Sequence, residues 1–436
     1  MREDIADPQA ARVGASIAVS ALTAPRPMAP PQRPFRARSS TLTVARLLRY
    51  VGPMRVLLLP SLVLASLSLV ACGDASPVAA VPDAGTPTDV PAVDVPVAVD
   101  VPVVVDAPAP VVMPHWSSLP VTDGPTGRWG VMVAERGDGT AWLYGGTTLT
   151  AAGRGTVSHD IWRYDGRGEA PTFELLTVTG SPPPRYCGCL AYDPMGDRIL
   201  MVGGRTPDVS APETWTLDLT TLAWTRAVTT GSPPGTIGCA MAWSASRNAM
   251  YLVGGASETG VNGRTWRFDP SGPGWQEVMA TGPRARYDHA LRSLDGGRSL
   301  LLFGGARSAT GSTNFFNDLW RFDTATEQWT QVTVEGASPP GRRTPWMVVE
   351  ADGAHLLMGL GVHGLQVSET FGDLWRLDLG ASRWTELTAD AAPADGSDGP
   401  PARGFTQGLP GPRGSLGLLL GGFDGRGPVD DAWVLR

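Results

Sequence analysis

Five arginines that recur at one place in a repeated stretch of the chain are the residues best suited by type and spacing to chemistry. Each ends a turn rich in proline and glycine, as in "SPPPR" and "SPPGR", and precedes an apolar segment. A guanidinium presents paired N–H donors that match a carboxylate or a phosphate. We therefore take these residues as candidate ligand-binding groups: Arg128, Arg185, Arg286, Arg342 and Arg403.

Two interpretations of these arginines stay open at the level of sequence. If the five guanidiniums gather around one opening, they form a funnel that attracts anions in an otherwise acidic protein. If each arginine pairs instead with a neighbouring aspartate or a loop carbonyl, the set holds the fold together. Thr236 stands at the corresponding place in a sixth copy of the turn, so that copy lacks the charge.

Histidines and serines give no pattern of a metal centre or a hydrolase. The five histidines, at positions 115, 159, 289, 355 and 363, lie in distant segments and form no pair with ligand spacing. The strand–turn–helix motif Gly-x-Ser-x-Gly does not occur. We therefore expect no metal, no cofactor and no catalytic residue, although an enzyme stays open as the alternative.

A unit that recurs six times must position the arginines. A glycine doublet follows an apolar run in five copies, as in "LLLFGG" at residues 300–305, and "HLLMGLG" at 355–361 is a degenerate sixth. Such a doublet permits the positive φ and the close backbone approach that a tight exit from a strand needs. Each copy spans about 50–60 residues, the length of a four-stranded propeller blade.

Aromatic residues recur with the same period. A segment such as "NDLWRFDTATEQW" at residues 317–329 carries one tryptophan after a polar residue and a second aromatic after the next turn. Large rigid rings bury much area, so we expect them to fill the wedge-shaped gaps between twisted sheets rather than to bind a ligand. The second aromatics are Phe173, Trp224, Trp275, Trp329 and Trp384.

These doublets, tryptophan segments and closing aromatics resemble the kelch-repeat family over residues 115–436. The resemblance implies an all-β fold, a six-bladed β-propeller, with the arginines at the start of each inner strand on the face that carries the loops after the doublets. Trp116 lies 57 residues before Phe173, in phase with the closing aromatics. We therefore expect the N-terminal strand to complete the sixth blade against residues 432–435, which removes a free edge.

Three cysteines lie within the repeats. Aligning "SPPPRYCGCL" with "SPPGTIGCAM" places Cys239 one step out of phase with both Cys187 and Cys189. Opposite phase lets side chains of adjacent blades face each other, and an exported protein meets an oxidising compartment. A disulfide from Cys239 to Cys187 or to Cys189 is one expectation, and small buried thiols are the other.

Residues 54–71, "MRVLLLPSLVLASLSLVA", have the order of an export signal: a charge, a short apolar core and small residues. The apolar core is shorter than the roughly 20 residues that span a membrane. Residues 69–72, Leu-Val-Ala-Cys, resemble the bacterial lipobox, which implies lipidation of Cys72. The alternative is an ordinary secretory signal with an incidental cysteine. Residues 1–53 are interpreted as a long leader or an over-extended gene start with no pattern that would fold alone.

Residues 72–114 repeat Val, Pro, Asp and Ala in short units, which favours an extended tether over a packed structure. With a lipid at one end, the tether would hold the domain away from a bacterial membrane, which we expect to be the outer one. The excess of acidic residues lies after residue 71, since residues 1–71 hold nine arginines and three acids. We therefore expect no nucleic-acid partner.

The expected function is non-catalytic binding of a protein or glycan, in the cell envelope or outside the cell, through the loop face of a monomeric propeller. Phe315, Phe316 and Phe371, on loops after the doublets, would anchor a partner or pack over the rim. The alternative is an enzyme acting on a sugar or sugar acid in the axial pocket, because kelch propellers include a copper radical oxidase and a carbohydrate epimerase branch. An open mouth rimmed by aromatics would favour binding, and converging acids and arginines would favour catalysis.

Overall fold

The computed structural model describes residues 113–436, except 150–153, 209–210, 309–313, 365–368 and 389–398. The predicted leader, the export signal, Cys72 and most of the tether lie outside the described residues. Within the described ranges the chain forms antiparallel β-strands and the 3-10 turn Asp295–Gly297. No helix in these ranges has the length and apolar character to cross a bilayer.

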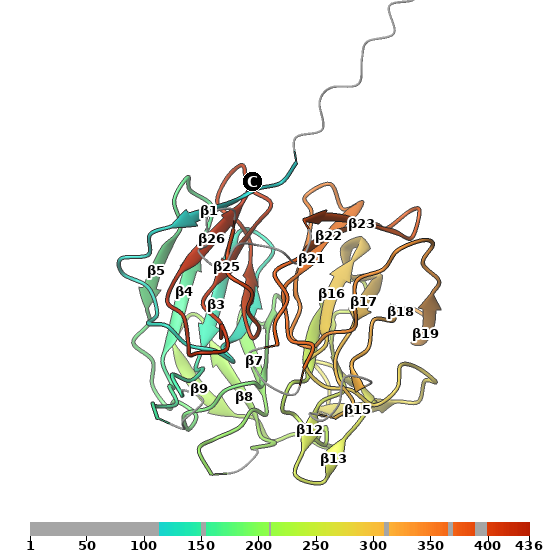
Figure 1. Cartoon of the computed structure of the whole chain (residues 1–436). Coiled ribbons are helices and arrows are strands. Elements are labelled where there is room, and N and C mark those ends of the chain that lie inside the picture. Colours follow the sequence, from blue (N-terminus) through green and yellow to red (C-terminus); the bar gives the residue numbers. More distant parts are fainter. Residues whose placement is uncertain (1–112, 150–153, 209–210, 309–313, 365–368, 389–398) are drawn as a thin grey trace, which may run out of the picture. The chain divides into compact units, whose positions relative to one another are not determined.

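Six four-stranded sheets form the blades of a propeller, as predicted, and the first strand of each sheet touches the first strands of its two neighbours around one axis (Figure 1). Blade 1 contains β2 (Met132–Glu135), β3 (Thr140–Tyr144), β4 (Ile161–Asp165) and β5 (Thr172–Leu175). Blade 2 contains β6 (Cys189–Asp193), β7 (Arg198–Val202), β8 (Thr214–Asp218) and β9 (Ala223–Arg226). Blade 3 contains β10 (Ala240–Ser244), β11 (Ala249–Val253), β14 (Thr265–Phe268) and β15 (Trp275–Val278), with the small hairpin β12 (Ala256–Ser257) and β13 (Gly260–Val261) beside it.

The remaining blades repeat this order. Blade 4 contains β16 (Ala290–Leu294), β17 (Ser299–Phe303), β18 (Leu319–Asp323) and β19 (Gln328–Val332). Blade 5 contains β20 (Trp346–Val349), β21 (His355–Gly359), β22 (Leu374–Asp378) and β23 (Arg383–Thr388). Blade 6 contains β24 (Gln407–Leu409), β25 (Gly417–Leu420) and β26 (Ala432–Leu435), and its fourth strand is β1 (Trp116–Leu119).

The strand β1 closes the ring, which confirms the predicted pairing of the two ends. Trp116 lies opposite Leu435 and Leu119 lies opposite Ala432 in an antiparallel ladder, and β1 lies beside β26 in Figure 1. The backbones of His115 and Arg436 exchange two further hydrogen bonds of 2.8 and 3.0 Å. Because β1 covers the outer edge of β26, the last blade is tied to the first ordered strand of the chain.

Aromatic side chains fill the gaps between blades. Trp329 of blade 4 is 7% exposed, its ring lies 4.9 Å from that of Phe322, and its indole N–H donates to Thr265 Oγ1 of blade 3 at 2.9 Å. Trp275 of blade 3 donates in the same way to Thr214 of blade 2 at 3.0 Å. Trp329 and Trp275 are therefore interblade wedges whose polar tip finds a partner in the preceding blade, whereas the buried indole N–H groups of Trp224 and Trp384 have no partner among the described residues.

The glycine doublets set the distance between successive blades. In every blade the backbone N–H of the second doublet position donates a hydrogen bond of 2.8–3.2 Å to the next blade. The acceptor is the backbone carbonyl of the arginine that precedes the first strand of that blade, or of Thr236 in blade 3. In blade 1 the first position has no room for a side chain, because a Cβ on Gly145 would lie 2.3 Å from the Arg185 carbonyl oxygen, whereas blade 5 accommodates the buried Leu360 at that position. The six donors are Gly146, Gly204, Gly255, Gly305, Gly361 and Gly422, and the acceptors in the same order are Arg185, Thr236, Arg286, Arg342, Arg403 and Arg128.

We expect Gly145→Ala to lower the free energy of unfolding by about 3 kcal/mol or more, because it adds a steric clash with the next blade to the strain of a positive φ. Gly336→Ala is the matched control: Gly336 also has a positive φ, but a Cβ there meets nothing within 4 Å. Its expected loss is about 1 kcal/mol. Urea unfolding measures both losses, and equal losses would contradict the interblade contact.

Candidate functional site

The five predicted arginines lie at the start of each blade's first strand and are buried, each at most 8% exposed. Arg286 shows the pattern: its Nε donates to the Arg284 carbonyl at 3.0 Å and its Nη1 to the Gly304 carbonyl at 2.8 Å, and both Nη atoms contact the Asp318 carboxylate at 2.6 and 2.8 Å. Each of the five pairs with the acidic residue just before the third strand of its own blade; these acids are Asp160, Glu213, Asp318, Asp373 and Asp431.

This geometry matches the second interpretation of the arginines, in which each one holds its own blade together. Burial would raise the pKa of Asp318, but the hydrogen bonds and positive charge of Arg286 hold that pKa below its ordinary value. The residues that line the two cavities on the axis do not include any of the five arginines. The burial and the ion pairs therefore favour a structural role over ligand binding for Arg128, Arg185, Arg286, Arg342 and Arg403.

Two of the loop phenylalanines stack on the arginines. The guanidinium of Arg286 lies 4.2 Å from the ring centre of Phe316, and that of Arg342 lies 4.0 Å from that of Phe371. Both rings stack on a cation that is already paired with a carboxylate. Phe316 and Phe371 therefore pack over the rim, which is the second of the two roles that the sequence left open for the loop phenylalanines.

Blade 3, which lacks the arginine, replaces it with an amide from the loop between β13 and β14. The Asn262 side-chain amide donates to the Pro234 carbonyl at 2.6 Å and to the Gly254 carbonyl at 3.2 Å, the two places that the arginine reaches in the other blades. Sequence reasoning missed this residue. A signal was present, because Thr236 replaces the arginine in the same blade in which Arg264 replaces the acid before the tryptophan.

The mouth of the axis is built from one left-handed backbone position in every blade. In each blade the residue two positions after the arginine, or after Thr236 in blade 3, has a left-handed backbone. The φ angles of these six residues lie between 50° and 67°. Backbone hydrogen bonds of 2.6–2.7 Å link four consecutive pairs of them. They surround a cavity of about 170 Å³, here called the upper cavity, and are Gly130, Cys187, Gly238, Asp288, Thr344 and Phe405.

Aromatic side chains rim this mouth. Trp129, Tyr186 and Tyr287 each lie one position before a mouth residue, and together with Phe405 they form what we call the aromatic collar. The Trp129 ring lies 5.3 Å from that of Tyr186 and 5.0 Å from that of Phe405, and its indole N–H donates to the Leu149 carbonyl at 2.9 Å. All four residues are half-buried, and the backbones of Trp129, Tyr186 and Tyr287 bridge the residues that directly follow three of the glycine doublets, Thr147, Arg205 and Ala306.

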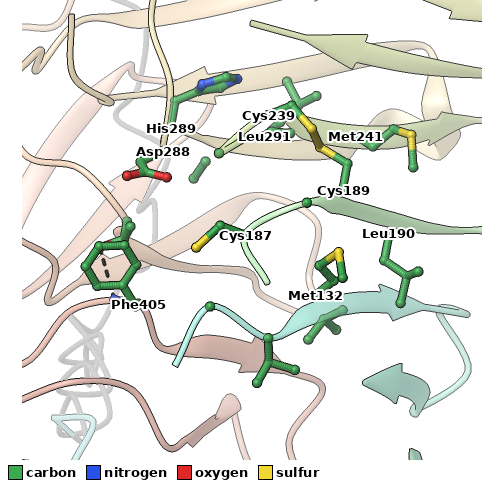
Figure 2. A pocket seen from close by; sticks show the side chains of 18 of the residues that line it. Met132, Cys187, Cys189, Leu190, Cys239, Met241, Asp288, His289, Leu291 and Phe405 are labelled. Atoms are coloured by element: carbon green, nitrogen blue, oxygen red, sulfur yellow. Dashed lines mark hydrogen bonds between the residues drawn. A yellow bond between two sulfur atoms is a disulfide. The ribbon is translucent and has the colours of Figure 1, made fainter. Parts of the chain in front are cut away.

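The upper cavity also gathers the cysteines. Of the two pairings left open by the sequence, the structure has Cys189–Cys239, with Cα atoms 5.8 Å apart, and Cys187 is a free thiol. Figure 2 shows the disulfide, the Cys187 thiol and the Asp288 carboxylate around the same space. Desolvation raises the pKa of the Cys187 thiol above its ordinary value, so the thiol stays protonated at neutral pH.

One acid and one arginine meet at the mouth. Asp288 lies 3.5 Å from the Arg343 guanidinium, and both side chains are nearly buried. Burial raises the pKa of Asp288 although the positive charge of Arg343 opposes the shift. The Arg343 guanidinium also lies 5.3 Å from the ring centre of Phe405. This pair is the feature of the mouth that catalysis would use.

A metal-ligand geometry occurs away from the axis, on blade 5. Ligand atoms of Glu350, Asp352 and His355 lie within 4.8 Å of one another. Both oxygens of Glu350, however, accept hydrogen bonds from Arg376 at 2.6 and 2.8 Å, and Asp352 contacts the His355 ring at 2.5 Å. These contacts account for the cluster as one ion pair and one hydrogen bond, which is why we assign no cation to it.

Comparisons with known proteins agree with this architecture. A family model for the KLHDC2/KLHL20/DRC7 Kelch-repeats domain matches residues 194–407. Adagio-like protein 3 of Oryza sativa subsp. japonica is 27% identical over 246 residues, which cover 52% of this chain and 37% of that protein. The Rab9 effector protein with kelch motifs of Mus musculus is 29% identical over 211 residues, 47% of this chain and 54% of that protein. The chain thus matches between about a third and a half of the length of these relatives.

Among solved structures, that of YjhT superimposes with a TM-score of 0.53 and 16% sequence identity, covering 71% of this chain and 95% of that one. At this identity the similarity shows the propeller fold alone. Together with the kelch family match and the kelch-containing relatives, it supports the kelch resemblance that the repeats carry.

His289, beside the upper cavity, makes stability depend on pH. It is 6% exposed, neither ring nitrogen has a hydrogen-bond partner among the described residues, and burial together with the charge of Arg286 lowers its pKa to about 3. Below about pH 6.5 the histidine of the unfolded chain binds a proton, whereas the folded protein keeps His289 neutral down to about pH 3. The free energy of unfolding therefore falls by about 1.4 kcal/mol for each pH unit between these two values and does not depend on His289 above about pH 6.5. We expect His289→Val, which copies Val131 of blade 1, to remove that slope in urea unfolding between pH 6.5 and 4. Equal slopes in the two proteins would contradict the assignment.

Proposed function

We propose that the chain is a non-catalytic binding module that holds a protein partner against the loop face of its propeller. The observation that carries this proposal is the aromatic collar at the mouth of the axis. Half-buried aromatic rings at the centre of a concave face are the groups that contribute most to protein–protein affinity. The kelch family match and the kelch-containing relatives, one of them named as an effector of Rab9, support a protein as the partner class.

The collar is also held rigidly, which favours recognition. The mouth residues have a fixed left-handed backbone joined by short hydrogen bonds, and the ring beneath them is closed by β1. Trp129 is fixed further by its hydrogen bond to Leu149. A partner that binds such a surface loses little of its affinity to ordering the site. Variable loops around a fixed ring then select the partner.

An enzyme acting on a sugar or sugar acid is the second candidate, favoured by the Asp288–Arg343 pair. The volume of the upper cavity argues against it. Sites for small molecules are usually about 300–1,000 Å³, whereas this cavity measures about 170 Å³. The carboxylate is also held by its own arginine partner at 3.5 Å. Binding at the collar is therefore the better-supported function of this face.

We expect the double variant Trp129→Ala/Tyr186→Ala to lose partner affinity by at least about ten-fold, because aromatic anchors carry a large share of binding energy. Met279→Ala is the matched control, since Met279 is 87% exposed and lies outside the collar, next to β15. Partners pulled down from solubilised envelopes are compared by quantitative mass spectrometry, after unfolding curves establish that both variants fold. An unchanged set of partners for the double variant would reject the collar as the binding surface.

We further propose that a lipid on Cys72 anchors the module to a bacterial membrane, the outer one in our interpretation, and that residues 72–114 act as the tether. The support is the sequence of residues 54–72, which lie outside the described residues. The partner then lies in the cell envelope or outside the cell, where a tethered propeller would reach it.

In this proposal Cys72→Ala prevents lipidation and moves the protein from the membrane fraction to the soluble exported fraction. Fractionation by immunoblot, together with labelling by a radioactive fatty acid, measures the change. Cys187→Ala is the control, because that half-buried thiol lines the upper cavity of the propeller and its loss should leave both measurements as in the wild type. A Cys72→Ala protein that keeps its label or its membrane location would overturn the anchor.

A further inference from the structure

The opposite end of the axis holds a second and larger cavity. This lower cavity measures about 700 Å³ and is lined by the ends of the first strands and the turns that follow them, from all six blades. Its volume is within the usual range for small-molecule sites. Arg292 lines both cavities and stands between them. The lower cavity takes no part in the function proposed for the aromatic collar.

Arg292 interrupts a small, apolar position. It is the third residue of the first strand of blade 4, where it lies opposite Leu301. The third residue of the first strand occupies the equivalent place in every blade. The residues at this place in the other blades are Ala134, Ala191, Ala242, Val348 and Leu409. A charged side chain on the axis is expensive to desolvate, so its presence calls for a partner or a ligand.

The partner comes from the opposite side of the ring. Glu135 of blade 1 points at Arg292 of blade 4, with 3.9 Å between the nearest oxygen and Nη2, which exceeds a direct hydrogen bond. The guanidinium is fixed by its Nε donating to the Met347 carbonyl at 2.9 Å and its Nη1 to the Leu291 carbonyl at 3.1 Å. A carboxylate and a guanidinium therefore face each other across the axis at a distance that leaves Nη2 without a close acceptor in Glu135.

Water reaches both groups from the cavity. The Glu135 side chain is 39% exposed and that of Arg292 is 28% exposed, although both lie inside the ring. Enclosure by protein raises the pKa of Glu135 above its ordinary value, with the charge of Arg292 opposing the shift. Trp243, half-buried, lines the same cavity from blade 3. Arg136 also lines the cavity, but it lies 3.5 Å from Asp197 and 3.8 Å from Asp138, two acids outside the lining that balance its charge. Glu135, Arg292 and Trp243 thus offer an acceptor, a donor and an aromatic wall to whatever enters.

We infer that the lower cavity binds a neutral, polyhydroxylated small molecule, a monosaccharide or the end of a glycan. Opposite charges that face each other attract one end of an ionic ligand and repel it from the other, so a net charge gains nothing there. Adjacent hydroxyls donate to Glu135 and accept from Arg292 at the same time. The apolar face of a sugar ring packs on Trp243.

The test uses the full chain and three neutral hexoses: glucose, galactose and mannose. Each is compared with its uronic acid and with its protonated 2-amino derivative, which have the same ring and carry opposite charges. Saturation-transfer difference NMR measures contact, and titration measures affinity. At least one neutral sugar should bind more tightly than both of its charged forms. Binding of a charged form in preference to its neutral parent, or no binding by any neutral hexose, would overturn the inference.

Two variants locate the site. Arg292→Ala restores the residue of blades 1 to 3 and should weaken the neutral sugar by at least about ten-fold while the protein stays folded. Glu135→Gln keeps the shape and removes the negative charge, so it should shift the preference toward the uronic acid. Trp129→Ala/Tyr186→Ala, at the other end of the axis, should leave sugar binding unchanged. Neutral-sugar affinity that is insensitive to Arg292→Ala would reject the lower cavity, and this outcome is independent of whether the collar binds a protein.

Discussion

The close approach of one blade to the next at the glycine doublets is the contact on which the rest of the structure depends. Six backbone N–H groups donate in turn to a carbonyl of the following blade, and the last of them, from Gly422, returns to Arg128. Because Gly145 leaves no room for a Cβ beside the Arg185 carbonyl, the blades approach to backbone contact. The tryptophan wedges then fill the outer gaps, where the sheets diverge, and β1 closes the circle.

Several residues that look chemical are part of this framework. The arginine that supplies a carbonyl to the previous blade also uses its guanidinium to join the turn, the doublet and the third strand of its own blade, as Arg286 does with Asp318. Blade 3 achieves the same bridge with Asn262 and no charge at all. The requirement is for donors at two carbonyls, which either an amide or a guanidinium satisfies.

Candidate function concentrates where single blades depart from the repeat on the axis. The collar arises because Trp129, Tyr186 and Tyr287 occupy a place where blade 5 has Arg343 and blade 6 has a glycine. In the same way, Arg292 and Glu135 replace apolar or neutral residues of the other blades, and they meet from opposite sides of the ring. Six similar walls make the cavity, and the few unlike residues give each end its chemistry.

The sequence by itself determined the repeat count, the β-propeller, the role of the tryptophans and the closing strand, because these follow from local patterns that recur six times. It left the arginines ambiguous, since burial and pairing depend on the acid that lies 28–32 residues away along the chain. It also left open whether Cys187 or Cys189 joins Cys239. Only the tertiary structure brought Glu135 and Arg292 together, because residues 157 positions apart become neighbours only when the ring closes around one axis.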